Sequence, residues 1–288
     1  MLFVTTTDKG TGKEVRLRYQ EYGSGKPVVF IHGWPLTGDM FEYQLDYLSR
    51  EGLRCIAYDR RGFGHSSKVG NSYNYDTLAD DLHAVITELD LRDVTLVGFS
   101  MGGGEIARYI GKYGNDRLSG AVLVSSVTPY MMDKSNDEAV DWSVFQGMID
   151  GMREDRPDFF ANWAKQFYGI GLLSHPVSDS FLGWTQGMAL TGSAKAGIDY
   201  VEAFAKTDFR QDLKKFTVPT MIIHGEDDKI VPIGIGGNAS AELLPDAIYH
   251  KYDSAPHGLF YTHKDRLNRD ILSFVKTKVT TKREIPVS

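Results

Sequence analysis

A regular stripe of apolar side chains runs through residues 75–90. Its members recur every three or four residues, the spacing that puts side chains on one face of a helix. They are Leu78, Ala79, Leu82, Val85, Ile86 and Leu89. The charged residues Asp80, Asp81 and Glu88 fall outside the stripe. The segment is therefore predicted to be an amphipathic helix that packs its apolar face on a core.

Short apolar runs on both sides of this helix are typical of buried strands. They lie at residues 3–6, 15–22, 27–33, 54–59, 93–97, 120–125, 219–225 and 247–252. Further helical patterns separate several of them, at 39–50, 103–113 and 265–275. Strands that alternate with helices predict the α/β fold class, with a mostly parallel central sheet and helices on both faces.

The alternation stops between residues 129 and 207. This stretch shows helical and loop patterns dense in large apolar residues, and no buried strand. We expect a core of residues 1–128 and 208–288, with residues 129–207 inserted as a helical cap over the strand ends. Most of the cap's aromatic side chains are expected to form its own core. The tail from Thr277 to Ser288 is expected to be mobile or to lie on a surface.

The sequence Gly98-Phe99-Ser100-Met101-Gly102 has the form G-x-S-x-G and stands between a predicted strand and a predicted helix. A serine at such a turn takes a strained backbone conformation and is held out at the end of the sheet. The two glycines allow the strand and the helix to approach closely. The motif alone is weak, but the strand and helix around it favour a nucleophilic serine.

A serine hydroxyl needs a base, and the base needs a carboxylate that fixes its tautomer. When the serine lies in such a turn, the chain order is serine, acid, histidine. His257 follows the last predicted strand and is the best candidate base. Asp227 and Asp228 both follow the strand at 219–225, and either could reach the histidine. His224 and His250 lie in strand patterns and are expected to be structural or solvated.

An acyl-transfer intermediate also needs backbone N–H groups around its oxyanion. Met101 follows the serine at a helix N-terminus, where the helix dipole favours an anion. A second donor is expected from the turn after the strand at 27–33. Pro35 has no N–H, so Trp34 is the candidate.

Composition narrows the function classes. The chain has 288 residues, is 42% hydrophobic and carries a net charge of −6, with no extended basic surface. Nucleic acid is therefore not an expected partner. No apolar run approaches the roughly 20 residues that span a membrane. Cys55 is the only cysteine and is expected to be a buried, inert thiol in a reducing compartment. We expect a cytoplasmic protein that can form a homo-oligomer, without a metal or other cofactor.

The chain resembles the α/β-hydrolase superfamily, and within it the cofactor-free, non-haem bacterial haloperoxidases, also called perhydrolases. Aryl esterases, γ-lactonases and γ-lactamases are close to that group. The matching segments run in the same order along nearly the whole chain. They are His32-Gly33-Trp34-Pro35-Leu36, Asp59-Arg60-Arg61-Gly62, Gly98 to Glu105, His224-Gly225-Glu226-Asp227-Asp228 and Ala255-Pro256-His257-Gly258.

The resemblance implies Ser100 as nucleophile, Asp228 as acid and His257 as base, with Trp34 and Met101 as oxyanion donors. Relatives that cleave haloalkanes or epoxides carry an aspartate at the serine's place. An ester or lactone is therefore the expected substrate. Hydrogen peroxide in place of water would give a peracid, and hence haloperoxidase activity without a cofactor. The alternatives are a γ-lactamase or amidase, a hydroxynitrile lyase, or a small-molecule receptor on the same fold.

The substrate is expected to be a small acyl compound held in an apolar pocket. Residues from the strand ends and from the cap should line this pocket. The candidates are Trp34, Val127, Met131, Phe145, Trp163 and Ile230.

Overall fold

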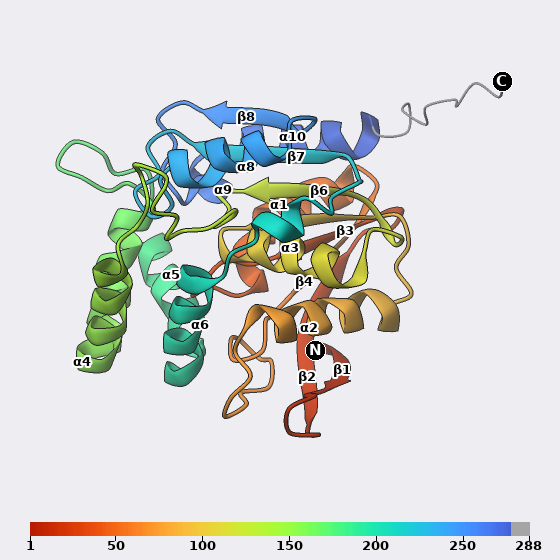
Figure 1. Ribbon diagram of the computed structural model, residues 1–288, viewed down its shortest axis with the longest axis horizontal. Coiled ribbons are helices and arrows are strands. Elements are labelled where there is room, and N and C mark those ends of the chain that lie inside the picture. Colours follow the sequence, from red (N-terminus) through yellow and green to blue (C-terminus); the bar gives the residue numbers. More distant parts are fainter. Residues whose placement is uncertain (278–288) are drawn as a thin grey trace.

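The computed structural model describes residues 1–277 and is built around one eight-stranded sheet (Figure 1). Its strands are β1 (Leu2–Thr7), β2 (Glu14–Tyr22), β3 (Lys26–Ile31), β4 (Leu53–Tyr58), β5 (Val94–Phe99), β6 (Leu118–Val124), β7 (Thr220–Gly225) and β8 (Ile248–Tyr252). Their order across the sheet is β1-β2-β4-β3-β5-β6-β7-β8. β2 pairs antiparallel with β1 and β4, and the remaining pairs are parallel.

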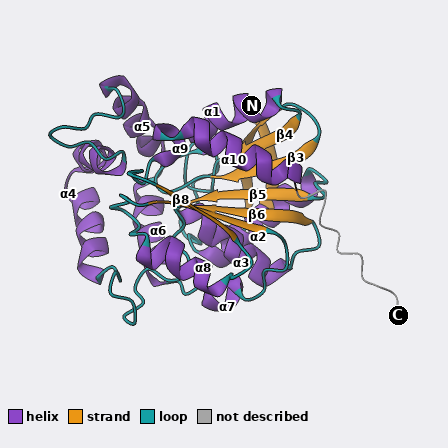
Figure 2. Ribbon diagram, turned by 90° about the horizontal axis from the view of Figure 1, so that it is seen from above, coloured by secondary structure: helices purple, strands orange, loops and turns teal. Residues whose placement is uncertain are grey.

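Helices cover both faces of the sheet. The core helices are η1 (Gly38–Phe41), α1 (Glu42–Arg50), α2 (Tyr75–Glu88), α3 (Met101–Tyr113), α7 (Arg210–Leu213), η2 (Gly234–Asn238), α8 (Ala239–Leu243), α9 (Leu259–Thr262) and α10 (Lys264–Thr277). Figure 2 shows α1 and α10 on one side of the sheet and α3, α7 and α8 on the other. The predicted fold class is confirmed.

Side-chain patterns explain the position of each strand. All six residues of β5 and all six of β7 are buried, as a strand covered on both faces requires. In β2, near the edge, Val15 and Leu17 are buried while Glu14 and Arg16 are exposed. Cys55 lies in β4 and is buried, and burial raises the pKa of its thiol to about 12. The expectation of a buried thiol is confirmed, and its inertness stays a prediction that the raised pKa favours.

Three helices stand beyond the sheet, between β6 and β7 in the chain (Figure 1). They are α4 (Trp142–Phe167), α5 (Asp179–Thr191) and α6 (Ala194–Lys206). α4 is kinked at Asp155, whose φ of −147° and ψ of 90° are not helical. Pro157 follows the kink, and the Asp155 side chain accepts a hydrogen bond from the Asp158 N–H, so the second half of α4 begins with its own cap.

The division of the chain at residues 128 and 208 remains a prediction. The end of the second core segment, residues 278–288, and with it all but the first residue of the predicted surface tail, lies outside the described residues. No helix among residues 1–277 is long and apolar enough to cross a membrane.

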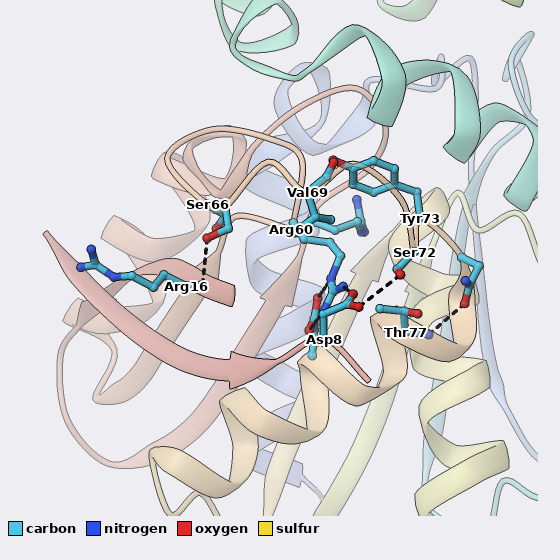
Figure 3. Close-up of polar contacts among 12 residues, drawn as sticks. Asp8, Arg16, Arg60, Ser66, Val69, Ser72, Tyr73 and Thr77 are labelled. Carbon is cyan, nitrogen blue, oxygen red and sulfur yellow. Dashed lines mark hydrogen bonds and ion pairs between the residues drawn. The ribbon is translucent and has the colours of Figure 1, made fainter. Parts of the chain in front are cut away.

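Two buried arginines fix the loop that follows β4. Arg60 Nε donates to Glu105 of α3 at 2.8 Å, and both side chains are fully buried. Arg61 is bound by Asp81 of α2 and by Asp8, each at 2.6 Å. Figure 3 shows Asp8 turned toward Ser72, whose hydroxyl donates to it at 3.4 Å. The loop is thus tied to the helix that starts beside Ser100.

Candidate active site

Ser100 occupies the turn between β5 and α3. Its φ of 53° and ψ of −117° place it in the left-handed half of backbone space, which is strained for a residue with a side chain. The flanking glycines permit this turn. A Cβ on Gly98 would lie 2.5 Å from the Gly102 carbonyl oxygen, and one on Gly102 would lie 2.2 Å from that of Ile31. The predicted sharp turn from strand to helix is therefore present.

His257 bridges the serine and an aspartate. It lies in the loop after β8, with its Nε2 3.0 Å from Ser100 Oγ. Its Nδ1 is 2.6 Å from Asp228 Oδ2. All three side chains are buried. Because Asp228 accepts at Nδ1, the ring is held in the tautomer that leaves Nε2 free to take a proton from the serine.

The loop after β7 selects Asp228 over Asp227. Asp227 is exposed, and its N–H bonds to the Ala255 carbonyl. Asp228 turns inward, and its Oδ1 accepts the N–H groups of Ile230 and Val231 at 2.9 and 2.8 Å. Burial acts to raise the pKa of Asp228, but the adjacent His257 and His224 outweigh it and hold that pKa well below its usual range. The carboxylate is thus ionised at neutral pH.

Aromatic rings enclose the histidine. The ring centroids of Phe99 and Phe167 each lie 4.9 Å from that of His257. The N–H of Gly258 donates to the Phe167 carbonyl at 2.8 Å. The histidine loop is therefore fixed to the C-terminal end of α4, and the ring has little room to turn away from Ser100.

The turn after β3 lies directly against the serine. A Cβ on Gly33 would be 3.2 Å from Ser100 Cβ, which places the following residue, Trp34, next to the nucleophile. Met101 is the first residue of α3, so its N–H is at the helix N-terminus. Both predicted oxyanion donors are therefore beside Ser100, and their role remains a prediction.

A cavity of about 700 Å³ opens onto Ser100. Side chains from the strand ends and from α4 and α6 line it. All six predicted pocket residues are among them: Trp34, Val127, Met131, Phe145, Trp163 and Ile230. The structure thus brings the predicted pocket and the predicted nucleophile together.

Two features of the site were missed by sequence reasoning. One wall of the cavity is polar and acidic, with Glu154, Asp155 and Asp158 around the kink of α4. The pair Asp155 and Pro157 could have indicated the kink, but not which side of the helix faces the cavity. The other feature is His224, expected to be structural or solvated, whose Nε2 lies 3.4 Å from Asp228 Oδ2. Its place four residues before Asp228 was the available signal.

The fold and this arrangement around a serine in a strand-to-helix turn are those of an α/β hydrolase. The family described as "alpha/beta hydrolase fold" matches residues 26–264. The chain is 44% identical over 269 residues to a non-heme chloroperoxidase from Kitasatospora aureofaciens, covering 91% of this chain and 96% of the relative. It is 38% identical over 283 residues to a bifunctional esterase/perhydrolase from Acinetobacter calcoaceticus, covering 96% and 100%.

Among solved structures, a bromoperoxidase from Bacillus anthracis superposes with a TM-score of 0.89 at 42% identity, over 94% of this chain and 99% of that chain. The chain belongs to the α/β-hydrolase family, in the group that contains the non-heme haloperoxidases and perhydrolases. The resemblance stated from the sequence is confirmed.

Proposed function

We propose that the protein is a serine hydrolase of small esters or lactones that also makes peracids from hydrogen peroxide. The observation that carries the proposal is His257, held between Ser100 Oγ at 3.0 Å and Asp228 at 2.6 Å beside a largely apolar cavity. Relatives named as chloroperoxidase and as esterase/perhydrolase support both activities.

In the hydrolytic reaction, Ser100 Oγ attacks the acyl carbonyl while His257 Nε2 takes the hydroxyl proton. The N–H groups of Met101 and Trp34 stabilise the resulting oxyanion. The tetrahedral intermediate expels the alcohol, which receives the proton from His257, and leaves an acyl ester on Ser100. Water, deprotonated by His257, then releases the carboxylic acid and restores the serine.

Peroxide can replace water in the second step. Hydrogen peroxide attacks the acyl ester, His257 removes its proton, and Ser100 departs with that proton, leaving a peroxycarboxylic acid. The peracid then oxidises bromide to hypobromous acid and is itself reduced to the carboxylic acid. In this scheme the protein catalyses acyl transfer only, and the halide reacts in solution.

The first test is hydrolysis of p-nitrophenyl acetate by the protein and by Ser100→Ala, with and without EDTA. We expect turnover that is lost in Ser100→Ala and unaffected by EDTA. Ser125→Ala is the matched control, because Ser125 is also a buried serine with positive φ, at 44°, outside the site. Turnover that survives Ser100→Ala would contradict the proposal.

The second test is peroxide-dependent bromination in acetate buffer by the same three proteins. We expect it to require Ser100 and not Ser125. Bromination that survives Ser100→Ala would contradict the acyl-transfer route to the peracid. Esters and lactones of matched size should then be compared, since both fit an acyl-enzyme route.

The proposal extends to the setting of the reaction. A small acyl compound is the expected partner, and nucleic acid is not. The lone, buried Cys55 supports a cytoplasmic location because the chain can form no internal disulfide. Cell fractionation tests the location, and light scattering tests the expected homo-oligomer.

A further inference from the structure

We infer that His224 is a positioning residue, which holds the Asp228 carboxylate where it can bond to His257. The inference rests on the proposed function, in which Asp228 orients the base. It assigns a task to a buried histidine that the reaction itself does not use.

The tautomer of His224 follows from its neighbours. Its Nε2 lies 2.9 Å from the Val231 carbonyl oxygen, which can only accept, so Nε2 carries a hydrogen. The same nitrogen is 3.4 Å from Asp228 Oδ2. The N–H therefore bonds to Val231 and presents its positive end to the carboxylate. It links the end of β7 to the loop that carries the acid.

The carboxylate is held at both oxygens. Oδ1 accepts the two N–H groups of Ile230 and Val231, while Oδ2 lies between the imidazoles of His257 and His224. If His224 were absent, Oδ2 would keep only its bond to His257. The Val231 carbonyl would also lose its partner, although the N–H of the same residue is one of those that fix Oδ1.

The imidazole of His224 is buried although one of its nitrogens makes no hydrogen bond within residues 1–277. His224 is fully buried, and its Nδ1 has no hydrogen-bond partner among the described residues. Such an atom costs stability, so a buried histidine kept at this place calls for an explanation. A purely apolar side chain would fill the space without this cost.

Glycines shape the space around the ring. A Cβ on Gly236 would lie 2.6 Å from His224 Cε1, and one on Gly237 would lie 2.8 Å from His224 Cβ. Both belong to η2, a single π-helical turn of the kind often found at functional sites. The imidazole thus fits between η2 and the acid loop.

The charges around the pair set the sign of the expected pH effect. The titratable groups facing Asp228 are His257 and His224, and both lower the pKa of the carboxyl. Tyr249 of β8 meets η2 beside His224, since a Cβ on Gly237 would lie close to both side chains, and its hydroxyl donates to Asn238 of η2. Removing the N–H of His224 makes the potential at His257 more negative. A more negative potential favours a positive charge on the base. As the pH is lowered, the variant should therefore lose activity at a higher pH than the wild type does.

The test compares His224→Phe, which keeps a ring but no donor, with His224→Gln, whose amide N–H can still reach Val231. In His224→Phe we expect kcat for p-nitrophenyl acetate to fall about 10- to 100-fold, as for a misplaced catalytic group. KM should change less, and the acid limb of the kcat/KM profile should move to higher pH. His224→Gln should recover most of both. Tyr249→Phe removes the hydrogen bond to Asn238 of the same turn without touching Asp228, and it should leave the profile in place.

Equal loss of kcat in both His224 variants with an unmoved acid limb would show a packing role and overturn the inference. If His224→Phe does not fold, His224→Asn replaces it, because its shorter amide cannot reach Val231.

A second readout needs no turnover: the low-field proton resonance of the Nδ1–H shared by His257 and Asp228 should shift in the donor-free variant and not in His224→Gln. An unshifted resonance overturns the inference, whereas an inactive wild type with a shifted resonance contradicts the proposed function alone.

Discussion

The indole Nε1 of Trp34 donates a buried 2.9 Å hydrogen bond to the carbonyl of Gly197. Trp34 follows β3 in the turn predicted to hold an oxyanion donor, and Gly197 lies in α6, far along the chain. The indole also meets the rings of Trp163 and Phe160 of α4 edge to face, at centroid distances of 5.6 and 5.7 Å. The turn beside the nucleophile is thus fixed by the helices that line the cavity.

Trp34→Phe should therefore affect catalysis as well as stability. The variant keeps a ring but loses the hydrogen bond, and we expect the free energy of unfolding in urea to fall by about 1–3 kcal/mol. Because the turn is then less firmly held, kcat should fall about tenfold or more. Phe41→Leu is the control, since Phe41 is a buried ring that packs on Phe30 at 5.0 Å and does not line the cavity. A stability loss with unchanged kcat would contradict the coupling.

Breaking the buried Arg60–Glu105 pair should destabilise the fold strongly. Glu105→Gln leaves the fully buried Arg60 without its counter-charge, and such changes cost about 3–5 kcal/mol. Urea unfolding measures the loss. Asp46→Asn is the surface control, because the exposed Asp46–Arg50 pair should contribute less than about 1 kcal/mol. Similar losses in both variants would show that burial does not decide the strength of these pairs.

The turn that carries Ser100 could be predicted from the sequence because it depends on local patterns. The apolar run of β5 and the glycines around Ser100 together define the strand-to-helix turn. Spacing alone could not separate Asp227 from Asp228, since both follow the same strand. The separation comes from a contact with distant chain: the Asp227 N–H bonds to Ala255, which leaves the next side chain pointing inward.

The pocket shows the same limit on a larger scale. Apolar residues such as Met131 and Phe145 could be chosen from the sequence because large side chains near strand ends are natural pocket walls. The acidic wall depends on the direction in which α4 continues after its kink at Asp155. That direction is set by packing between helices, which hydrophobic periodicity does not report.

The pH dependence of stability should include one proton from His32. Burial and the charge of Arg60 hold the pKa of His32 well below its usual value, so the folded protein keeps it neutral while the unfolded chain binds a proton below about pH 6.5. The contribution is therefore fully present above that pH and is lost as the pH falls. Below that pH, this one proton lowers the free energy of unfolding by about 1.4 kcal/mol per pH unit.

His32→Gln removes this proton but can still accept the Arg60 N–H, which His32 Nε2 accepts at 2.9 Å. Urea unfolding at about pH 7.5 and about pH 5 should show a shallower loss of stability in the variant, by roughly one proton. At the higher pH the histidine is neutral in both the folded and the unfolded state, so the difference in free energy of unfolding between the two proteins there reports the effect of packing. Equal slopes in the two proteins would mean that His32 is protonated in the folded state.

Two glycine-to-alanine changes should act in opposite directions. A Cβ on Gly102 would sit 2.2 Å from the backbone oxygen of Ile31, so Gly102→Ala must push α3 away from β3. We expect a loss of about 1–3 kcal/mol or more in the free energy of unfolding, as for an overpacked core. Since α3 begins beside Ser100, kcat should fall with it.

Gly187 lies inside α5, and a Cβ there would meet no atom within 4 Å. Gly187→Ala should therefore stabilise the protein by about 0.5–1 kcal/mol, because alanine restricts the unfolded chain and favours the helix. Urea unfolding of the two variants decides the point: shifts of the same sign would show that the closeness of α3 and β3 does not depend on a missing side chain at Gly102.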